Sequence, residues 1–564
     1  MNRTAAQALV ATLEAHGVDR VFCVPGESYL PVLDALRDAA GIRLVTCRHE
    51  SGAGFMAVAD AKLTGRAGTL FVSRGPGAAN AAIAVHTADQ DAAPMVLFVG
   101  QVPRRDLGRR AFQEVDYVTT FADMAKRVVQ VEDPGALAAT AAEAYRTAES
   151  GTPGAVVVAV PEDVFSGPAE VQPFAPLPRP RLLPAEGDVA AVAERLAAAE
   201  RPLVVAGGAV GGLAGRRALQ AAAERWRLPV AVGFKRQDLF ANDHPNFAGY
   251  LGYGAPKALV DMLAEADLVL AVGTRLGDVT TQGYRLPRPD QPLLQVYPDA
   301  AQLGRVFPLE IGVAAEVAPF LEALAGRAPP PAPPGRAEWL ARLHALHAEL
   351  ARWRPATAPP DGVDFGHVVA ALGVALGPDA VLITDGGNFA SWAHRYFPFK
   401  PTQTLLGAVT GAMGFGVPAA VAAALRHADR QVVALVGDGG FLMTGNELAT
   451  ALKYGARVRI FVADNRSYGT IRLHQEKAYP GRPVATELVN PDFARLAEAF
   501  GAVGLRIDRP EDAPETVRRA LAADGPVVVG VRTSLEHISA YTTLADLARP
   551  ASEPAETGAS GAVR

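Results

Sequence analysis

Short apolar runs alternate with stretches of helical periodicity in three segments of the chain. The first segment, from Val21 to about Ser166, contains the runs VFCV, IRLVTC, GTLFVS, PMVLFVG and GAVVVAV. Continuous β-branched runs of this length are typical of strands that are buried on both faces of a parallel sheet. The same alternation returns from about Asp188 to Leu324 and from about Asp364 to Thr533. The pattern predicts an α/β protein with three doubly wound parallel-sheet domains.

Two proline-rich passages, SGPAEVQPFAPLPRPRLLPAEG and GRAPPPAPPGR, separate the three segments. Passages of this composition are typical of linkers that run over a surface. We therefore predict an N-terminal domain over residues 1–166, a central domain over 185–325 and a C-terminal domain over 355–545. The last stretch, 549–564, is rich in small and polar residues, and we expect it to be disordered.

Composition and charge narrow the class of function. The chain has 564 residues and a net charge of -5, which gives no basic footprint for a nucleic acid partner. The stretch 1–20 has amphipathic helical spacing instead of a continuous apolar signal core, and no run reaches membrane-spanning length. Cys23 and Cys47 lie in strand-like runs, so we expect core thiols. These features favour a cytoplasmic protein that acts on small molecules and has no membrane partner.

The most informative stretch for chemistry runs from Val432 to Gly469. Two β-branched runs, VVALV and VRIFVA, flank one helical segment, which predicts a βαβ unit with parallel strands. Asp438 and Asn465 then follow the carboxyl ends of the two strands, where open α/β sheets bind ligands. A carboxylate and an amide oxygen suit Mg²⁺, and Gly439 and Gly440 allow backbone N–H groups to approach an anion. GDGG alone is first of all an ordinary turn.

The order Gly437-Asp438-Gly439 followed by Asp464-Asn465 resembles the signature of thiamine-diphosphate enzymes, and it makes the site specific. The three-domain layout, over nearly the whole chain, resembles the group of acetolactate synthase, pyruvate oxidase and benzoylformate decarboxylase, closest to acetolactate-synthase-like large subunits. The resemblance implies that thiamine diphosphate and Mg²⁺ are the cofactors. It implies that Asp438, Asn465 and the carbonyl of Ser467 ligate the metal.

In the N-terminal domain the resemblance assigns residues to the aminopyrimidine ring of the cofactor. Glu50, in CRHESGAGF, matches the catalytic carboxylate of the family. Without the family, a glutamate there is a surface charge at a helix N-terminus. Gly26 in VPGESYL, and Pro76 and Asn80 in SRGPGAAN, match positions near the ring. Gln113, in the segment VGQVPRRDLGRRAFQEVDY, matches a residue that reaches the reacting carbon.

In the C-terminal domain the resemblance assigns residues to the diphosphate and to the bend of the cofactor. Asn388, in TDGGNFASW, aligns with an amide that binds the diphosphate, whereas Phe389 stands where the family has a histidine. In GAMGFGVPAA, the Gly411 carbonyl would hold the 4′-amino group and Met413 would wedge between the two rings. A methionine is more commonly a gap-filling core residue.

Positions that would face the substrate match the acetolactate synthases poorly. Glu27 stands where acetolactate synthases have a small residue, and His474 stands where they have a tryptophan. Each is interpreted either as a catalytic residue that contacts the substrate or transfers a proton, or as a surface residue. We expect decarboxylation of a 2-oxo acid with carboligation to a second carbonyl compound. The alternatives are a non-oxidative decarboxylase, a 2-hydroxyacyl lyase, and a catalytically idle subunit that binds the cofactor.

The resemblance also carries expectations about assembly and about a second cofactor. It implies a homo-oligomer, a dimer or a dimer of dimers, with active sites at the subunit interface. Relatives of the acetolactate synthase branch hold FAD in the central domain. The turn GGAVGG (Gly207–Gly212) is not a secure dinucleotide motif, and we do not expect FAD here.

Overall fold

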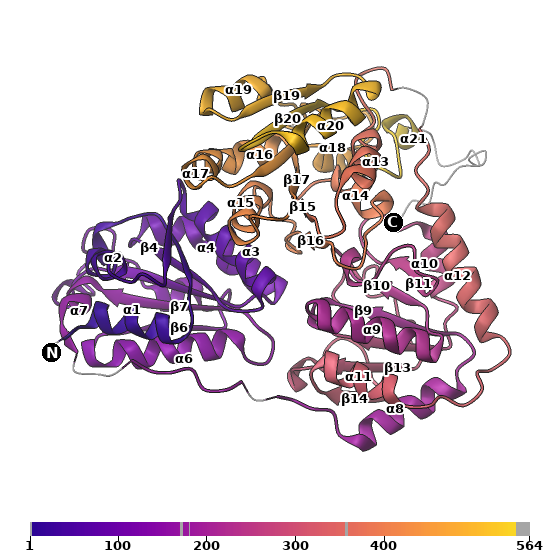
Figure 1. Cartoon of the computed structure of the whole chain (residues 1–564), viewed down its shortest axis with the longest axis horizontal. Coiled ribbons are helices and arrows are strands. Elements are labelled where there is room, and N and C mark those ends of the chain that lie inside the picture. Colours follow the sequence, from indigo (N-terminus) through magenta and orange to yellow (C-terminus); the bar gives the residue numbers. More distant parts are fainter. Residues whose placement is uncertain (1–2, 170–172, 180, 356–358, 549–564) are drawn as a thin grey trace.

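The computed structural model describes residues 3–169, 173–179, 181–355 and 359–548. It contains three six-stranded sheets in which neighbouring strands are parallel. In Figure 1 the N-terminal domain is indigo to violet, the central domain magenta to salmon, and the C-terminal domain orange to yellow. The predicted fold class of three doubly wound parallel-sheet domains is confirmed. The exact domain boundaries stay predictions, and the tail at 549–564 lies outside the described residues.

The N-terminal sheet has the strand order β3-β2-β4-β5-β7-β6, and a short antiparallel pair, β1 with β8, lies beside it. Its inner strands β2, β4, β5 and β7 are entirely buried, because helices cover both faces, whereas the edge strands β3 and β6 are partly exposed. The strands are β1 (Arg3–Thr4), β2 (Arg20–Cys23), β3 (Arg43–Thr46), β4 (Gly68–Val72), β5 (Met95–Gln101), β6 (Arg127–Gln130), β7 (Ala155–Pro161) and β8 (Pro168–Ala169). The helices are α1 (Ala5–Ala15), α2 (Leu30–Arg37), α3 (Glu50–Thr64), α4 (Pro76–Asp91), α5 (Tyr117–Phe121), α6 (Leu137–Glu149) and α7 (Glu162–Ser166).

The central sheet has the order β11-β10-β9-β12-β13-β14. Its strands are β9 (Pro202–Ala206), β10 (Val230–Val232), β11 (Phe247–Tyr250), β12 (Leu268–Val272), β13 (Leu293–Tyr297) and β14 (Ile311–Ala314). Its helices are α8 (Glu186–Ala198), α9 (Leu213–Trp226), α10 (Lys257–Leu263), α11 (Val317–Gly326) and α12 (Arg336–Leu350). Two apolar clusters cover the two faces of this sheet.

The C-terminal sheet has the order β16-β15-β17-β18-β20-β19. Its strands are β15 (Val381–Thr384), β16 (Thr404–Leu406), β17 (Val432–Gly437), β18 (Val458–Asp464), β19 (Val503–Ile507) and β20 (Val527–Arg532). Its helices are α13 (Gly366–Ala375), α14 (Ala390–Tyr396), α15 (Gly416–Arg426), α16 (Asp438–Thr444), α17 (Leu448–Tyr454), α18 (Gly469–Ala478), α19 (Phe493–Phe500), α20 (Ala513–Ala522) and α21 (Leu544–Ala548).

The predicted βαβ unit is present, with one difference. Strands β17 and β18 are parallel neighbours, and Gly455 ends the helix with a left-handed φ of +66°, as its position predicts. The segment expected to be a turn, Asp438–Gly440, is instead the first turn of α16, and a 3₁₀ turn at Gly445–Glu447 separates α16 from α17. Gly445 is required there because a Cβ on it would lie 2.7 Å from the Phe441 ring.

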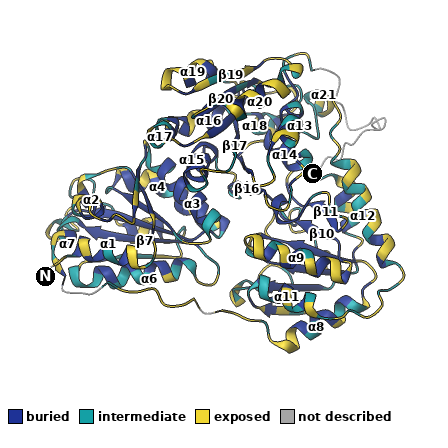
Figure 2. Cartoon of the chain, in the orientation of Figure 1, coloured by how far each residue is buried: buried dark blue, intermediate teal, exposed yellow. Residues whose placement is uncertain are grey.

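The N-terminal and C-terminal domains share one apolar core. Helix α3 packs against α15, and both belong to the same buried cluster. Figure 2 shows α15 in dark blue, and its residues 416–425 are all buried. Within the N-terminal domain, α3 also packs closely on α4, since a Cβ on Gly54 would lie 2.3 Å from the Ala84 Cβ. The two domains are therefore fixed against each other by apolar packing over the length of a helix.

Asp91 lies where all three domains meet. Its buried carboxylate pairs with Lys62 at 2.5 Å and accepts a hydrogen bond from the Val409 backbone N–H at 3.1 Å. Lys62 also donates to the Gly407 carbonyl at 2.6 Å, and Arg236 of the central domain lies 3.6 Å from the carboxylate. Loss of one partner from a buried pair of this kind costs about 3–5 kcal/mol. The junction is thus a polar contact that orders the three domains relative to one another.

Two expectations from composition can be compared with the structure. Cys23 and Cys47 are buried free thiols, as predicted. Among the described residues, no helix is both long enough and apolar enough to span a membrane.

Candidate active site

Asp438 and Asn465 lie side by side because they follow the neighbouring parallel strands β17 and β18. Asp438 is 3% exposed, and burial raises the pKa of its carboxyl to about 6, with the nearby charge of Asp464 adding to the effect. The Asn465 side-chain oxygen accepts a hydrogen bond from the Ser467 N–H at 3.1 Å. The loop after β18 is therefore folded back so that the amide and the backbone of Ser467 lie together.

Asn490 is a site residue that the sequence reasoning missed. Its amide nitrogen donates to Asp438 Oδ2 at 2.8 Å and to Asp464 Oδ1 at 2.7 Å. It precedes α19 in an ordinary Asn-Pro-Asp-Phe stretch. The one signal in the sequence that could have pointed to it is that the Asp438 and Asp464 carboxylates need a hydrogen-bond donor. Its own side-chain oxygen is buried without a hydrogen-bond partner. Asn490 thus fixes the orientation of the Asp438 carboxylate from outside the βαβ unit.

Glycines from three loops converge next to Asp438, and we call Gly386, Gly411, Gly439 and Gly440 the cradle. A Cβ on Gly386 would lie 2.3 Å from the Gly411 carbonyl oxygen, and one on Gly439 would lie 2.7 Å from the Tyr468 ring and 3.3 Å from Met413 Cε. Backbone without side chains lets an anionic group approach main-chain N–H donors closely. Met413, half-buried, lies at the edge of this group.

Asp385 holds the cradle loops together, and it too was missed. It is 1% exposed and accepts hydrogen bonds from the backbone N–H groups of Gly414 at 3.0 Å and Phe415 at 3.2 Å. Burial raises the pKa of this carboxyl to about 6. A Cβ on Gly440 would lie 2.8 Å from Asp385 Oδ2. One buried carboxylate therefore contacts two of the three loops and sets their spacing.

Asn388 lies at the rim of the cradle. Its backbone N–H donates to Thr470 Oγ1 at 2.9 Å, and its side-chain amide donates to the Ile538 carbonyl. A Cβ on Gly469 would lie 2.9 Å from the Asn465 amide and 3.0 Å from the Asn388 oxygen, so the two asparagines meet over this glycine. Phe389, in place of the family histidine, is buried against Phe365.

The residues fit a hard divalent cation. Among the described residues, no group of three or more His, Cys, Asp or Glu side chains is placed to hold a metal. The donor set at the cradle is instead one carboxylate, one amide oxygen and one backbone carbonyl, of Asp438, Asn465 and Ser467. Oxygen ligands of low total charge, completed by phosphate oxygens, are typical of Mg²⁺ sites.

Glu50 lies at the carboxyl edge of the N-terminal sheet as the first residue of α3. Its Oε2 accepts a hydrogen bond from the Asn80 amide at 2.9 Å. A Cβ on Gly77 would lie 3.4 Å from Oε1, so this glycine allows the second oxygen to approach the start of α4. The structure thus brings together two residues that sequence matching selected independently, Glu50 and Asn80.

The turns after β2, β4 and β5 meet beside Glu50. A Cβ on Gly26 would lie 2.4 Å from the Ser73 Cβ, which places the turn after β2 against the turn that carries Pro76. Gly75 has a left-handed φ of +51° and approaches the Gln113 carbonyl so closely that a Cβ would lie 2.8 Å from it. Gln113 itself has a φ of +65°, a left-handed conformation that is uncommon for a non-glycine residue.

Glu447 connects the Glu50 loop to the C-terminal domain of the same chain. Its fully buried carboxylate accepts hydrogen bonds from the Arg48 and His49 N–H groups, both at 3.0 Å, and from Thr450 Oγ1 at 2.5 Å. A Cβ on Gly52 would lie 2.4 Å from Glu447 Oε1, so only glycine fits at this point of α3. Burial raises the pKa of this carboxyl, and the hydrogen bonds oppose the rise.

Glu27 and His474, the two candidate substrate contacts, both have exposed side chains. Glu27 has a side chain 63% exposed and pairs with Arg74 at 2.5 Å, and Arg74 also pairs with Glu162 at 2.8 Å. His474 is exposed on α18. Both interpretations of each residue, substrate contact and surface residue, therefore stay open as predictions.

The predicted residues form two groups. The first, around Glu50, makes its hydrogen bonds and close approaches within the N-terminal domain, and the second, around Asp438, makes its own within the C-terminal domain. Large exposed apolar side chains lie near each group: Leu30, Ile83 and Phe112 in the first, and Leu442, Met443 and Ile471 in the second. Each of the two groups of predicted site residues thus has large exposed apolar side chains near it.

Family comparisons cover all three domains. The description "Thiamine pyrophosphate enzyme, N-terminal TPP binding domain" matches residues 3–120, the corresponding central domain matches 189–324, and the corresponding C-terminal TPP binding domain matches 385–531. The last range contains the whole of the Asp438 group, and the first contains the whole of the Glu50 group.

Individual relatives match over nearly the full length. The chain is 34% identical to an acetolactate synthase of Mycobacterium bovis, over 93% of this chain and 87% of the relative. It is 32% identical to an acetolactate synthase large subunit of Parasynechococcus marenigrum, over 93% and 87%. It is 31% identical to an acetolactate synthase isozyme 1 large subunit of Escherichia coli, over 94% of both chains.

The geometry predicts that Glu447→Ala loosens the Glu50 loop. The change leaves the N–H groups of Arg48 and His49 without their acceptor, at about 1–3 kcal/mol for each buried donor. We expect faster hydrogen exchange at these two amides and a lower thermal midpoint. Glu498→Ala, an exposed site on α19, is the matched control and should change neither. Unchanged exchange at both amides in Glu447→Ala would show that the loop does not depend on this contact.

Proposed function

The chain belongs to the family of thiamine pyrophosphate enzymes, and we propose that it decarboxylates a 2-oxo acid and joins the remaining fragment to a second carbonyl compound. The observation that carries the proposal is the presence in one chain of both half-sites: Glu50 held by Asn80, and Asp438 next to Asn465 beside the glycine cradle. A catalytically idle subunit would need only the second half. The names of the relatives support the coupling step in particular.

The C-terminal half-site would hold the diphosphate and a Mg²⁺ ion. Asp438, Asn465 and the Ser467 carbonyl would ligate the metal, and the backbone of Gly439 and Gly440 would border the phosphate oxygens. In this structure the Gly439 N–H donates to Asp438 Oδ1 at 2.8 Å. Asn490 keeps the Asp438 carboxylate in one orientation, and a metal ion would favour its ionised form against the effect of burial. Gly411 and Met413 would set the position and bend of the two rings.

The N-terminal half-site would control protons. Bound thiamine diphosphate supplies a nucleophilic carbon for the carbonyl of the 2-oxo acid and an electron sink for the departure of CO₂. Glu50 would hold a proton between its carboxyl oxygen and the aminopyrimidine nitrogen, with Asn80 fixing the other oxygen. Pro76 and Gly26 would border the ring, and Gln113 would orient the substrate carbonyl.

The two half-sites would be completed by a second copy of the chain. Each half-site is bordered by large apolar side chains that the single chain leaves exposed, such as Phe112 (76%) and Leu442 (49%). Contiguous apolar surface beside a functional site is typical of an interface. A symmetric pair of chains would bring the Glu50 group of one copy against the Asp438 group of the other and would form two equivalent sites.

Flavin is not part of this proposal. In the central domain, the glycine turn after β9 is packed by the protein itself: a Cβ on Gly208 would lie 2.9 Å from Arg236 Nε, and one on Gly207 would lie 2.5 Å from the Gly273 carbonyl oxygen. These contacts explain the glycines without a dinucleotide. That FAD is not bound stays a prediction, and the visible absorbance of the purified protein tests it.

The proposed reaction is tested with a panel of 2-oxo acids. Each acid is supplied alone and together with an aldehyde or a second 2-oxo acid. The protein with thiamine diphosphate and Mg²⁺ should release CO₂ and form a coupled product, both followed by mass spectrometry. Glu50→Gln should lower turnover by about 10²–10⁴, the usual contribution of a positioned proton-transfer group. Glu132→Gln, an exposed site, is the control. Aldehyde without coupled product would indicate a plain decarboxylase, and no CO₂ from any acid would exclude decarboxylation.

Asn490→Leu should weaken metal binding without removing a ligand. Outer partners of metal ligands contribute about 10–100-fold to affinity, so the Mg²⁺ concentration for half-maximal activity should rise by that factor. Val489→Ala changes a neighbouring side chain that is 98% exposed, and it should leave the Mg²⁺ dependence unchanged. An Asn490→Leu protein with the wild-type Mg²⁺ dependence would contradict the assignment.

Leu442→Asp together with Met443→Asp should separate the chains. Two carboxylates on the apolar border of the second half-site would have to be desolvated at the interface. We expect the mass by light scattering to fall to that of one chain, and activity to fall with it. Val374→Asp, on an exposed apolar residue of α13, is the control. A monomer that keeps full activity would refute a site shared between two copies.

A further inference from the structure

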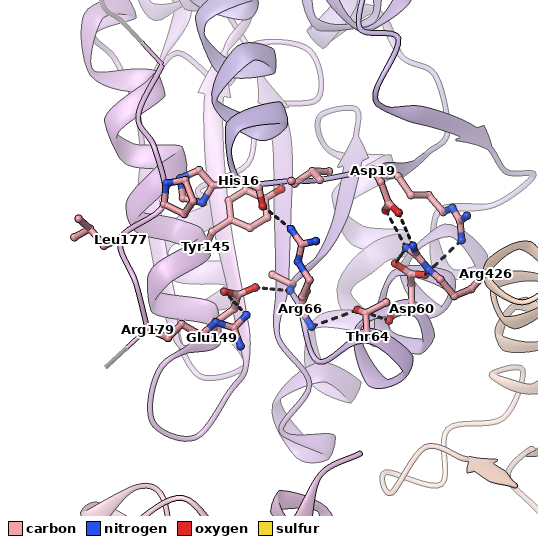
Figure 3. Close-up of a pocket in the computed structure, with 15 residues that line it drawn as sticks. His16, Asp19, Asp60, Thr64, Arg66, Tyr145, Glu149, Leu177, Arg179 and Arg426 are labelled. Carbon is pink, nitrogen blue, oxygen red and sulfur yellow. Dashed lines mark hydrogen bonds and ion pairs between the residues drawn. The ribbon is translucent and has the colours of Figure 1, made fainter. Parts of the chain in front are cut away.

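A cavity of about 230 Å³ lies on the N-terminal domain at the edge opposite to Glu50. It is lined by the segment His16–Arg20, which leads into β2, and by Arg66 and Ala67, which lead into β4, so it lies at the amino ends of these strands. Figure 3 shows Leu177 and Arg179 of the linker on one side of it and Arg426 of α15 on the other. Two domains and a linker thus enclose it.

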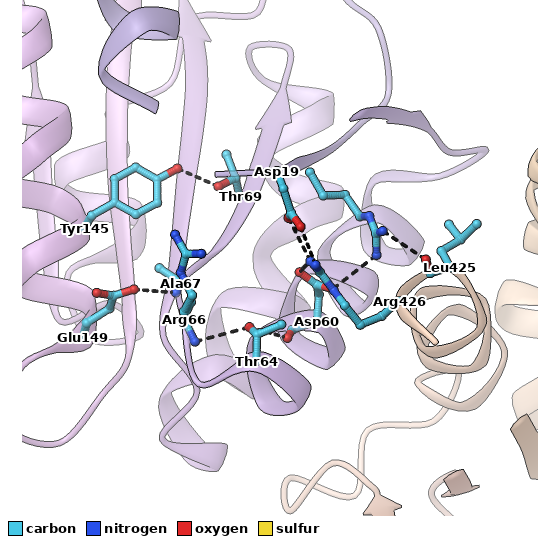
Figure 4. Close-up of polar contacts among 11 residues, drawn as sticks. Asp19, Asp60, Thr64, Arg66, Ala67, Thr69, Tyr145, Glu149, Leu425 and Arg426 are labelled. Atoms are coloured by element: carbon cyan, nitrogen blue, oxygen red, sulfur yellow. Dashed lines mark hydrogen bonds and ion pairs between the residues drawn. The ribbon is translucent and has the colours of Figure 1, made fainter. Parts of the chain in front are cut away.

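Positive charge in the lining exceeds negative charge. Four arginines line the cavity against three carboxylates: Arg20, Arg66, Arg179 and Arg426, with Asp19, Asp60 and Glu149. Two of the carboxylates are occupied by a single arginine, because Arg426 pairs with Asp19 at 2.5 Å and with Asp60 at 2.8 Å (Figure 4). Arg179 pairs with Glu149 at 2.6 Å.

The remaining two arginines are left with weak partners. Arg20 has only a 3.5 Å contact with Asp60 and a bond of 3.0 Å to the Leu425 carbonyl. Arg66 donates to the His16 carbonyl at 2.5 Å, and among the described residues it forms no ion pair with a carboxylate. An anion in the cavity would therefore meet the Arg66 guanidinium, which has no carboxylate partner among the described residues, and the Arg20 guanidinium, whose contact with Asp60 is long at 3.5 Å.

Two buried nitrogens at the cavity have no hydrogen-bond partner. They are Nε of Arg20, a residue only 9% exposed, and Nε2 of His16. A buried guanidinium N–H without an acceptor is costly, and such groups are usually satisfied by a ligand or an ordered water. Burial lowers the pKa of His16, so its ring is neutral near pH 7, and a neutral ring nitrogen pairs well with a hydroxyl.

We propose that this cavity is a binding site for a small oxyanion that also carries a hydroxyl, of which hydrogen phosphate is the simplest. The ionised oxygens would accept from Arg20 and Arg66, and the hydroxyl would pair with Nε2 of His16. A simple carboxylate has the charge but lacks the hydroxyl. The site is separate from the cradle and holds groups from the N-terminal domain, the linker and the C-terminal domain, so its occupation stabilises their arrangement.

Calorimetric titration of the full chain tests this, with the protein first saturated with thiamine diphosphate and Mg²⁺ so that the cradle is filled. At constant ionic strength, inorganic phosphate should bind with one site per chain, and acetate at least tenfold more weakly. Glycerol 3-phosphate distinguishes the source: tighter binding than inorganic phosphate assigns the site to a phosphate monoester, and weaker binding assigns it to free phosphate. Activity is not the readout, so the result does not depend on the proposed reaction.

Variants place the binding at the cavity. Arg66→Ala, at an exposed position, and His16→Phe should each weaken phosphate at least tenfold, whereas Arg217→Ala, an exposed arginine of α9, should not. If His16→Phe fails to fold, Arg66→Ala alone decides. Absence of saturable binding, or binding that Arg66→Ala leaves unchanged, would overturn the proposal and leave a water-filled cavity.

Discussion

The buried carboxylate of Glu447 is the contact on which the proposed active site most depends. It belongs to the C-terminal domain, yet it accepts hydrogen bonds from two backbone N–H groups of the loop that ends at Glu50. A charge-assisted bond with no solvent exposure is stronger than a neutral one, and it is costly to leave unmade. Because Gly52 has no Cβ, α3 can pack directly on this carboxylate. The start of α3, and so the direction of Glu50, is thus set by the domain that carries the cradle.

The remaining geometry follows from parallel sheets. In a parallel pair the carboxyl ends of neighbouring strands meet at one edge, and this brings Asp438 next to Asn465 and the turn of Gly26 next to that of Pro76. Runs of β-branched residues were enough to predict these strands. A glycine at the expected C-terminal end of the helix between them, Gly455, was enough to predict where that helix ends. The fold class and the neighbourhood of the βαβ residues could therefore be predicted from local sequence alone.

Residues that act through long-range contacts could not be predicted in this way. Asn490 lies 52 positions from Asp438, and Glu447 lies 399 positions from Arg48. Asn490 lies in a loop and Glu447 in a 3₁₀ turn, and only tertiary packing gives each its partners. Asp385 lies inside the motif TDGGNFASW but carries no local mark of its role, which is to accept hydrogen bonds from a loop about thirty positions away. The 3₁₀ turn before α17 was missed for the same reason, since it contains Glu447, whose partners Arg48 and His49 lie in the other domain.

Helix α15 relates the two polar centres of the molecule. At its start, the N–H groups of Gly414 and Phe415 bind Asp385 beneath the cradle, and at its end Arg426 pairs with Asp19 and Asp60 of the N-terminal domain. Between these ends it carries only small and apolar residues, which are buried on all sides. A helix in this setting moves as a rigid element, because a packed interior offers no room for gradual bending. The spacing between the cradle and the arginine-lined cavity is therefore fixed by one helix. A displacement of Arg426 would also displace the loops that would position the cofactor.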